Sequence, residues 1–182
     1  MLSDDGKVVV DTAINADENA FVVVNGMRGP IFEDITDPFI TGNGQIVAYG
    51  ASTKSGWLLV IGDRQIPMAR SLSRCSLAVS SDGRRYACTL NERIGHSSAR
   101  RVMVDGVMGE AFAEVGKPSF SADGRHVTYA ASSGDKEFIV VDGQKFEAPG
   151  RRTDPIFTFD GKSVSYAALL GREIWWKVRV VE

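Results

Sequence analysis

The chain has 182 residues, of which 43% are hydrophobic and 24% charged, and its formal net charge is -2. These values are typical of a folded globular domain with one sizeable core and exclude the composition of a disordered chain. Since the net charge is near zero and no apolar run approaches the ~20 residues that span a bilayer, we expect neither a nucleic-acid partner nor membrane insertion.

The N-terminal residues 1–6 contain neither a basic start nor an apolar stretch. We therefore expect no signal peptide in this chain. Two locations stay open, the cytoplasm or, for a mature or truncated form, the periplasm.

A four-residue motif recurs along the chain: Ser or Thr, any residue, Asp or Asn, and Gly. The five copies are Ser3–Gly6, Thr41–Gly44, Ser80–Gly83, Ser121–Gly124 and Thr158–Gly161. Their glycines lie 38, 39, 41 and 37 positions apart, which indicates an internal repeat of roughly 40 residues. The motif is typical of a tight hairpin turn, because Gly adopts a positive φ and Asp, Asn, Ser and Thr bond nearby backbone N–H groups.

Strand-like segments flank each turn. Segments such as Pro118–Ser121 and Pro155–Thr158 precede it, and apolar residues follow three and five positions after the Gly. These pairs are Val47 and Tyr49, Tyr86 and Cys88, Val127 and Tyr129, and Val164 and Tyr166. The alternation predicts a strand with one buried face, on which Tyr49, Tyr129 and Tyr166 are mostly buried.

A second hairpin follows within each repeat. Runs rich in Val, Ile and Phe lead into Asn25-Gly26, Gly62-Asp63, Asp105-Gly106 and Asp142-Gly143, which are strong hairpin signals. The last run, 174–181, has no return strand after it. One repeat is therefore strand A, an Asp-Gly turn, strand B, a looser loop, strand C, a second Gly turn and strand D.

Four-stranded meanders repeated every ~40 residues are the signature of β-propeller blades. The sequence thus predicts a single all-β domain over residues 1–182, a β-propeller-type array that we interpret as five-bladed, with repeats at approximately 1–36, 37–74, 75–115, 116–152 and 153–182. We count four A, five B, five C and four D strands, with incomplete first and last blades. No segment shows a sustained helical period, so we expect almost no helix.

The pattern Pro-x-Phe-Ser-x-Asp-Gly-Arg-x-Val-x-Tyr at 118–129 resembles the TolB-type, WD-like propeller repeat of bacterial proteins, and 155–166 repeats it with Thr and Lys. The resemblance covers essentially the whole chain. It implies a docking platform for a partner and carries no catalytic residue with it.

Two cysteines, Cys75 and Cys88, lack metal-ligand spacing and flank the turn at 81–83. A two-residue loop would place them opposite each other, whereas a left-handed bulge at Gly83 shifts the pairing. We favour the bulge and expect no disulfide between them.

The incomplete terminal repeats permit three arrangements: a five-bladed ring, the remnant of a larger propeller, or two chains that complete one another. The run 174–181 contains Trp175 and Trp176, of which we expect one to enter the core. Since its few charges guard the edge weakly, we expect self-association through the terminal blades, as a homodimer.

Antiparallel order places the tight A–B and C–D turns at one end of the array and the B–C and D–A loops at the other. We expect binding at the loop end. The B–C loops are predicted at 13–20, 51–56, 91–99, 131–137 and 168–173. The candidate binding residues are Glu92, Arg93 and His96 in one B–C loop and Arg151, Arg152 and Asp154 in one D–A loop.

The sequence contains no nucleophile elbow, zinc-protease motif or phosphate loop, and we expect no metal and no cofactor. We interpret the chain as a non-catalytic binding module for a protein or a small molecule. The alternative is a carbohydrate-active, glycosidase- or lectin-like, five-bladed propeller, because six carboxylates lie at the loop end. They are Glu33, Asp34, Asp37, Glu92, Glu114 and Asp154.

Overall fold

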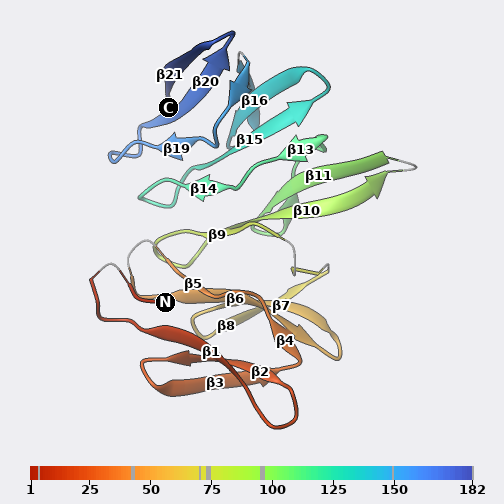
Figure 1. Ribbon diagram of the computed structural model, residues 1–182, viewed down its shortest axis with the longest axis vertical. Coiled ribbons are helices and arrows are strands. Elements are labelled where there is room, and N and C mark those ends of the chain that lie inside the picture. Colours follow the sequence, from red (N-terminus) through yellow and green to blue (C-terminus); the bar gives the residue numbers. More distant parts are fainter. Residues whose placement is uncertain are drawn as a thin grey trace. The chain divides into compact units, whose positions relative to one another are not determined.

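The computed structural model describes residues 1–3, 5–41, 44–69, 71–72, 75–94, 97–148 and 150–181. These residues form 21 strands in five antiparallel sheets, and none of them forms a helix (Figure 1). The chain thus has the all-β, propeller-type organisation that the repeat predicts. None of the described segments is a helix capable of crossing a membrane.

The chain divides into two compact units, residues 1–75 and 76–182. Unit 1 holds two sheets. Sheet 1 consists of β1 (Val10–Ile14), β2 (Ala20–Val24) and β3 (Met27–Phe32). Sheet 2 consists of β4 (Asp34–Ile35), β5 (Phe39–Ile40), β6 (Val47–Thr53), β7 (Gly56–Ile61) and β8 (Arg64–Met68).

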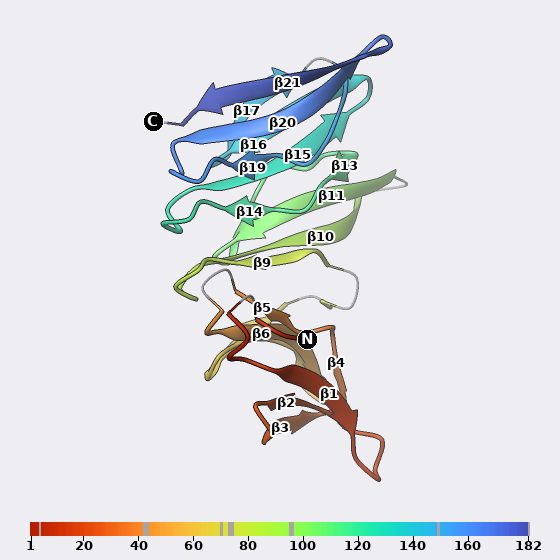
Figure 2. The same cartoon turned by 60° about the vertical axis from the view of Figure 1, so that its left-hand side comes forward.

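Unit 2 holds three sheets, which follow one another in chain order (Figure 2). Sheet 3 consists of β9 (Leu77–Val79), β10 (Tyr86–Ile94), β11 (Ser97–Val104) and β12 (Val107–Met108). Sheet 4 consists of β13 (Glu114–Val115), β14 (Ser119–Phe120), β15 (Val127–Ser133), β16 (Lys136–Val141) and β17 (Gln144–Ala148). Sheet 5 consists of β18 (Arg151–Arg152), β19 (Ile156–Phe157), β20 (Ser163–Leu170) and β21 (Glu173–Val180).

The repeated A–B turns have the backbone conformation that the motif predicts. The glycines at 6, 44, 83, 124 and 161 have φ between +70° and +74°. In each turn the Gly N–H donates to the carbonyl of the Ser or Thr three residues earlier, as Gly124 does to Ser121 at 2.9 Å. The Ser121 N–H in turn donates to the carbonyl of His126 at 2.9 Å. The glycine therefore sits in the left-handed bulge that fixes the register of the hairpin.

Side chains reinforce the same turn. In the third repeat the Ser80 hydroxyl donates to Asp82 Oδ1 at 2.6 Å, and the Arg84 N–H donates to the same oxygen at 3.0 Å. The Arg85 N–H donates to Ser80 Oγ at 3.0 Å. The hydroxyl hydrogen bond, followed by the backbone one, lowers the pKa of Asp82, and equivalent bonds lower the pKa values of Asp5, Asp123 and Asp160. The polar residues of the motif are thus structural.

The C–D turns fasten onto the start of strand B. Asn25, Asp105 and Asp142 all adopt positive φ, each followed by a Gly with positive φ, as a two-residue hairpin turn requires. The N–H of Val127 donates to Asp142 Oδ1 at 2.9 Å, and the N–H of Asp142 donates to the Val127 carbonyl at 2.9 Å. Both turns of a repeat therefore hold the first residues of strand B.

The strands lie where the sequence predicts them, with three additional short ones. These are β4, β13 and β18, and each pairs with the same B strand as the A strand that follows it. A proline separates the two pieces in each case, at Pro38, Pro118 and Pro155. Since proline has no N–H to donate, it interrupts the pairing and divides strand A.

The predicted B–C loops are wrong in length. The described strands leave only residues 54–55, 134–135 and 171–172 between B and C, and residues 15–19 in the first repeat. Glu92 and Arg93 accordingly lie within strand β10 and not in a loop. The polar Ser- and Thr-containing segments at the ends of strands B and C continue the backbone pairing. Each of these hairpins therefore extends to a two-residue turn.

The buried faces agree with the alternation along strand B. Tyr49 and Tyr129 are buried, as are Val127 and Val164, whereas Tyr166 is only half-buried. Cys75 and Cys88 are not joined by a disulfide, and Cys88 pairs in register with Leu77. The bulge at Gly83 has therefore shifted the pairing as expected.

The apolar core of each unit lies between successive sheets. One cluster joins sheets 3 and 4 and includes Val102, Phe112, Val127, Tyr129 and Val140. Phe112 meets the edge of the Tyr129 ring at a centroid distance of 6.5 Å, and Phe32 meets Tyr49 similarly in unit 1 at 6.1 Å. Each sheet thus buries an apolar face against its neighbour in the unit.

The expectation that one of the paired tryptophans enters the core is wrong. Trp175 is 48% exposed and Trp176 is 64% exposed. Both lie in β21, which pairs with β20 alone among the described strands, and neither face of β21 is covered enough to bury them.

Gly124 and Gly161 provide a matched pair for testing the turn. They have φ +71° and +70°, but a Cβ on Gly124 would lie 3.1 Å from the Ser80 Cβ, whereas on Gly161 the nearest Cβ, that of Ser121, is 3.7 Å away. We expect Gly161→Ala to cost ~1–2 kcal/mol from the left-handed backbone alone and Gly124→Ala to cost more. Urea unfolding followed by far-ultraviolet circular dichroism measures the difference. Equal losses for the two variants would show that the contact with Ser80 relaxes freely.

Candidate functional site

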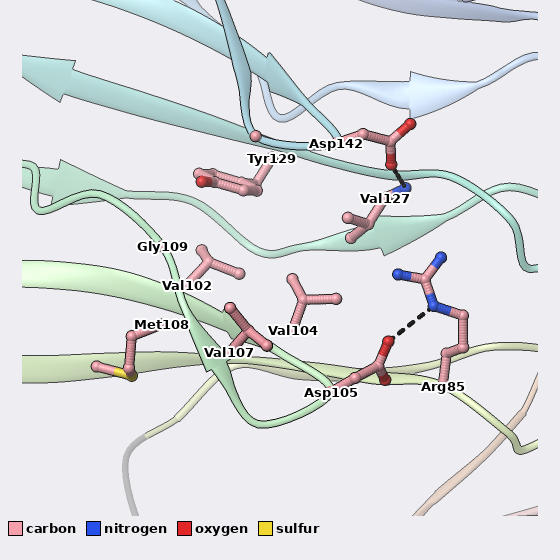
Figure 3. Close-up of a pocket in the computed structure, with 11 residues that line it drawn as sticks. Arg85, Val102, Val104, Asp105, Val107, Met108, Gly109, Val127, Tyr129 and Asp142 are labelled. Atoms are coloured by element: carbon pink, nitrogen blue, oxygen red, sulfur yellow. Dashed lines mark hydrogen bonds and ion pairs between the residues drawn. The ribbon is translucent and has the colours of Figure 1, made fainter.

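A pocket opens in unit 2 where sheet 3 meets sheet 4, and its volume is about 370 Å³. Figure 3 shows the side chains that line it. Strand β11 supplies Val102 and Val104, strand β12 supplies Val107 and Met108, and strand β15 supplies Val127 and Tyr129. Gly109, Gly143, Arg85, Asp105 and Asp142 complete the lining.

The pocket has an apolar end and a polar end (Figure 3). Tyr129, Val102 and Met108 lie towards one end, and Arg85, Asp105 and Asp142 lie towards the other. Val102, Val127 and Tyr129 are buried, whereas Val107 is 73% exposed and Met108 41% exposed. The apolar end therefore continues outward into an apolar rim.

Hydrogen bonds hold the charged side chains of the polar end. Arg85 Nε donates to Asp105 Oδ2 at 2.8 Å, and Asp105 Oδ1 accepts from the Tyr86 N–H at 2.9 Å. The Arg85 guanidinium also donates to the carbonyls of Gly124 and Arg125 in the A–B turn of the next repeat. Arg85 thus links the two sheets at the pocket and is fixed before any ligand arrives.

Asp142 is held in the same way by residues of its own sheet. Its Oδ1 accepts from the Val127 N–H, and its Oδ2 lies 2.6 Å from His126 Nδ1. Both pocket carboxylates are therefore already engaged by a backbone N–H and a basic side chain. This arrangement offers a fixed polar surface for recognition.

Tyr129 closes the apolar end. Burial, followed by the negative charge of Glu110, raises the pKa of Tyr129 to about 12. The neutral phenol is therefore the form present near neutral pH. A Cβ on Gly109 would lie 3.5 Å from its hydroxyl, so Gly109 and the Tyr129 hydroxyl lie close together at the pocket wall.

The residues predicted at the loop end form two separate groups. Glu92 in β10 pairs with Arg101 at 2.5 Å. Arg152 in β18 pairs with Glu137 at 3.0 Å and interacts with the charge of Asp154. Arg93 is exposed in β10. His96 and the side chain of Arg151 lie outside the described part of the chain.

Arg152 is more enclosed than a solvated surface residue. Its side chain is only 10% exposed, and its Nε is buried without a hydrogen-bond partner within the described residues. Burial lowers the pKa of Arg152, and the charges of Glu137 and Asp154 oppose that change. Glu137 of the same chain thus already supplies a carboxylate to this candidate binding residue.

The carboxylates of the carbohydrate-active alternative are partly occupied as well. Glu92 and Glu114 pair with Arg101 and Arg100, at 2.5 Å and 2.6 Å. Asp154 Oδ2 accepts from the Lys117 N–H at 3.4 Å. Within the described residues no cluster of three or more His, Cys, Asp or Glu side chains could hold a metal ion.

The sequence did not predict the pocket, because its residues lie at the turn end, where tight turns indicate little side-chain chemistry. One signal was available. When the repeats are aligned on the first residue of the C–D turn, the fourth residue after it is large and apolar in two of them, Ile66 after Gly62 and Phe146 after Asp142. After Asp105 the fourth residue is Gly109.

Comparisons with known proteins support the fold. No family model and no curated protein matches the chain. Among solved structures, the β-propeller domain of the Trilobed protease from Pyrococcus furiosus, described as having an open velcro topology, covers 99% of this chain and 69% of its own length at 10% identity and a TM-score of 0.53. TolB from Acinetobacter baumannii matches 98% of this chain at 13% identity and a TM-score of 0.47.

The chain spans 50% of the length of that TolB structure. Together with the repeated Asp-Gly turns and the antiparallel sheets, the likeness to the protease propeller shows a β-propeller fold. It shows the fold alone, because the identity is low and propellers serve many functions.

The raised pKa of Tyr129 predicts a loss of stability in alkali. The native state keeps the phenol protonated to about pH 12. An unfolded tyrosine ionises near pH ~10, so the contribution of Tyr129, about 3 kcal/mol for a shift of about two pKa units, is present below pH ~10 and is lost as the pH rises towards 12. We expect the free energy of unfolding of Tyr129→Phe to fall less than that of the wild type over this range, measured by urea unfolding at each pH. Tyr166→Phe, at the equivalent position of the next sheet, is the control, and equal slopes for wild type and Tyr129→Phe would contradict the prediction.

Proposed function

We propose that this chain is a non-catalytic binding module that takes its ligand in the pocket between β11, β12 and β15. The observation that supports the proposal is the 370 Å³ cavity, with its aliphatic walls and its fixed polar end. Ligand pockets in proteins are mostly apolar, have a few oriented polar groups, and start at volumes of ~300 Å³.

The state of the polar residues favours binding over catalysis at this site. Acid–base or nucleophilic catalysis needs a side chain that accepts a proton and can reach the substrate. Asp105 and Asp142 each accept a backbone N–H and lie against Arg85 and His126. These carboxylates can therefore orient a ligand, and we assign them no proton transfer or nucleophilic attack.

The loop end is the place where the sequence suggests binding. Glu92, Arg93, Arg152 and Asp154 lie in or beside strands there, and Arg152 and Glu92 already have partners in the chain. A protein partner that contacts these residues would meet a charged, preformed surface. We place the ligand in the pocket because apolar burial drives association, whereas Glu92 and Arg152 at the loop end already have charged partners in the chain.

A fragment screen monitored by backbone amide NMR tests the proposal. With the full chain and a set of small neutral fragments, we expect saturable shifts at Gly106, Gly109, Val127 and Gly143. Val107→Glu should weaken these shifts by roughly tenfold or more, since a charge would enter the apolar rim.

Met27→Glu is the matched control, because Met27 follows Asn25-Gly26 as Val107 follows Asp105-Gly106 and is 71% exposed. It should leave the shifts unchanged. Shifts that gather instead around Glu137 and Arg152, or no saturable shift at all, would contradict the assignment of the pocket.

Self-association is a separate proposal. Strand β21 exposes Ile174, Trp176, Val178 and Val180, and we propose that a second copy of the chain covers them. Light scattering should then report a mass near twice 19.7 kDa, and Trp176→Glu should return it to the monomer value. A monomer at all micromolar concentrations, unaffected by Trp176→Glu, would end the idea.

A further inference from the structure

Two neighbouring sheet junctions in unit 2 carry equivalent hollows. The first is the pocket already described, between sheets 3 and 4. The second lies between sheets 4 and 5 and is lined by Val141, Asp142, Gln144, Phe146, Arg179, Val180 and Val181. Val104, Asp105 and Val107 of the first correspond in repeat position to Val141, Asp142 and Gln144 of the second.

The two hollows differ at the fourth residue after the Asp of the C–D turn. In sheet 4 this residue is Phe146, which pairs in register with Ile139. In sheet 3 it is Gly109, whose N–H donates to the carbonyl of Val102, the residue equivalent to Ile139. The second junction therefore contains an aromatic ring that the first lacks.

The second junction also shows how such a ring is held. Phe146 packs against the apolar cluster that contains Ile139, Val141 and Val164. The Arg179 guanidinium lies over the ring, with Cζ 3.5 Å from the centroid. The ring thus has aliphatic walls on one side and a cation on the other, which is a favourable environment for an aromatic side chain.

The first pocket offers aliphatic walls and a guanidinium but contains no such ring, and its Arg85 Cζ lies 5.4 Å from the centroid of Phe120. Its walls are Val102, Val104 and Val127, and the Arg85 guanidinium lies at its polar end (Figure 3). Arg85 is fixed by Asp105 and by the carbonyl of Gly124, so its position does not depend on a ligand. The vacancy at Gly109 is therefore complementary to an aromatic ring.

We propose that the pocket binds an aromatic side chain presented by a peptide segment of a partner protein. This inference rests on the proposed function and specifies its ligand. A peptide, as opposed to a free ring, is indicated by the rim, because Val107 and Met108 stay exposed beside the pocket and lie in the short outermost strand of sheet 3. Residues that flank the aromatic anchor would cover them.

Capped pentapeptides of sequence Gly-Ser-Xaa-Ser-Gly, with Xaa as Phe, Trp, Leu or Ala, test the proposal by amide NMR titration of the full chain. We expect saturable shifts at Gly106, Gly109 and Gly143 with the Phe and Trp peptides. The Leu peptide should bind about tenfold more weakly, because it lacks the ring that Arg85 can contact, and the Ala peptide should show no saturation.

Val104→Phe provides the matched variant. Val104 is only half-buried and lines the pocket, so the new ring should fill the vacancy from within and abolish the shifts caused by the Phe peptide, while the remaining spectrum keeps its native dispersion. Val141→Phe, at the equivalent position of the next junction, should leave peptide binding unchanged if it folds.

The outcomes separate this inference from the proposed function. If the Leu peptide binds in the pocket as tightly as the Phe peptide, the pocket binds ligands but the aromatic specificity is wrong. If acetyl-phenylalanine amide binds as tightly as the Phe pentapeptide, the flanking segment contributes nothing and the peptide part is wrong. If neither peptides nor fragments shift the pocket residues, the proposed function itself fails.

Discussion

Burial of the strand-B face between successive sheets is the constraint on which the structure of each unit depends. A four-stranded sheet of this length cannot bury its apolar face alone, so Val127 and Tyr129 become core residues only because Val102 and Phe112 of the preceding sheet lie against them. Each such side chain stabilises the fold by ~1.5–3 kcal/mol relative to exposure. Any hollow along this junction therefore lies within the region that holds two sheets together.

The turns ensure that the correct face is buried. A slip of one residue in strand β15 would move Val127 and Tyr129 to the opposite face of the sheet. Two independent devices prevent this: the Gly124 bulge fixes the pairing of β14 with β15, and the Asp142 carboxylate holds the Val127 N–H. The strength of the repeat signal in the sequence reflects this requirement, since the Ser or Thr, the Asp and the Gly of the four-residue motif all take part in the turn.

The turns, the strand order and most buried positions could be predicted because they follow from local chemistry. Gly124 and Asp142 are residues typical of the turns in which they lie. The alternation that includes Tyr129 indicates which face of strand B is buried. The lengths of the B–C hairpins could not, because segments such as Ser132-Ser133 read equally well as loop or as polar strand ends. The burial of Arg152 and the exposure of Trp175 depend on which neighbours cover them, and a pattern within one strand does not contain that information.

The pocket could not be predicted from the sequence for a different reason. It arises from a change in the backbone of strand D in sheet 3 as well as from the missing side chain at Gly109. In sheet 3 Phe112 lies seven positions after Asp105, whereas in sheet 4 the buried Ala148 lies six positions after Asp142. The extra residue brings the chain at Gly109 so close to β11 that a Cβ would lie 2.8 Å from the Val102 carbonyl oxygen. Sheet 1 repeats the pattern, with Gly29 close to the Val22 carbonyl and an irregular register between β2 and β3. A bulged D strand with a glycine at this position therefore moves the backbone inward, and the junction of sheets 3 and 4 lacks the ring that Phe146 supplies to the junction of sheets 4 and 5.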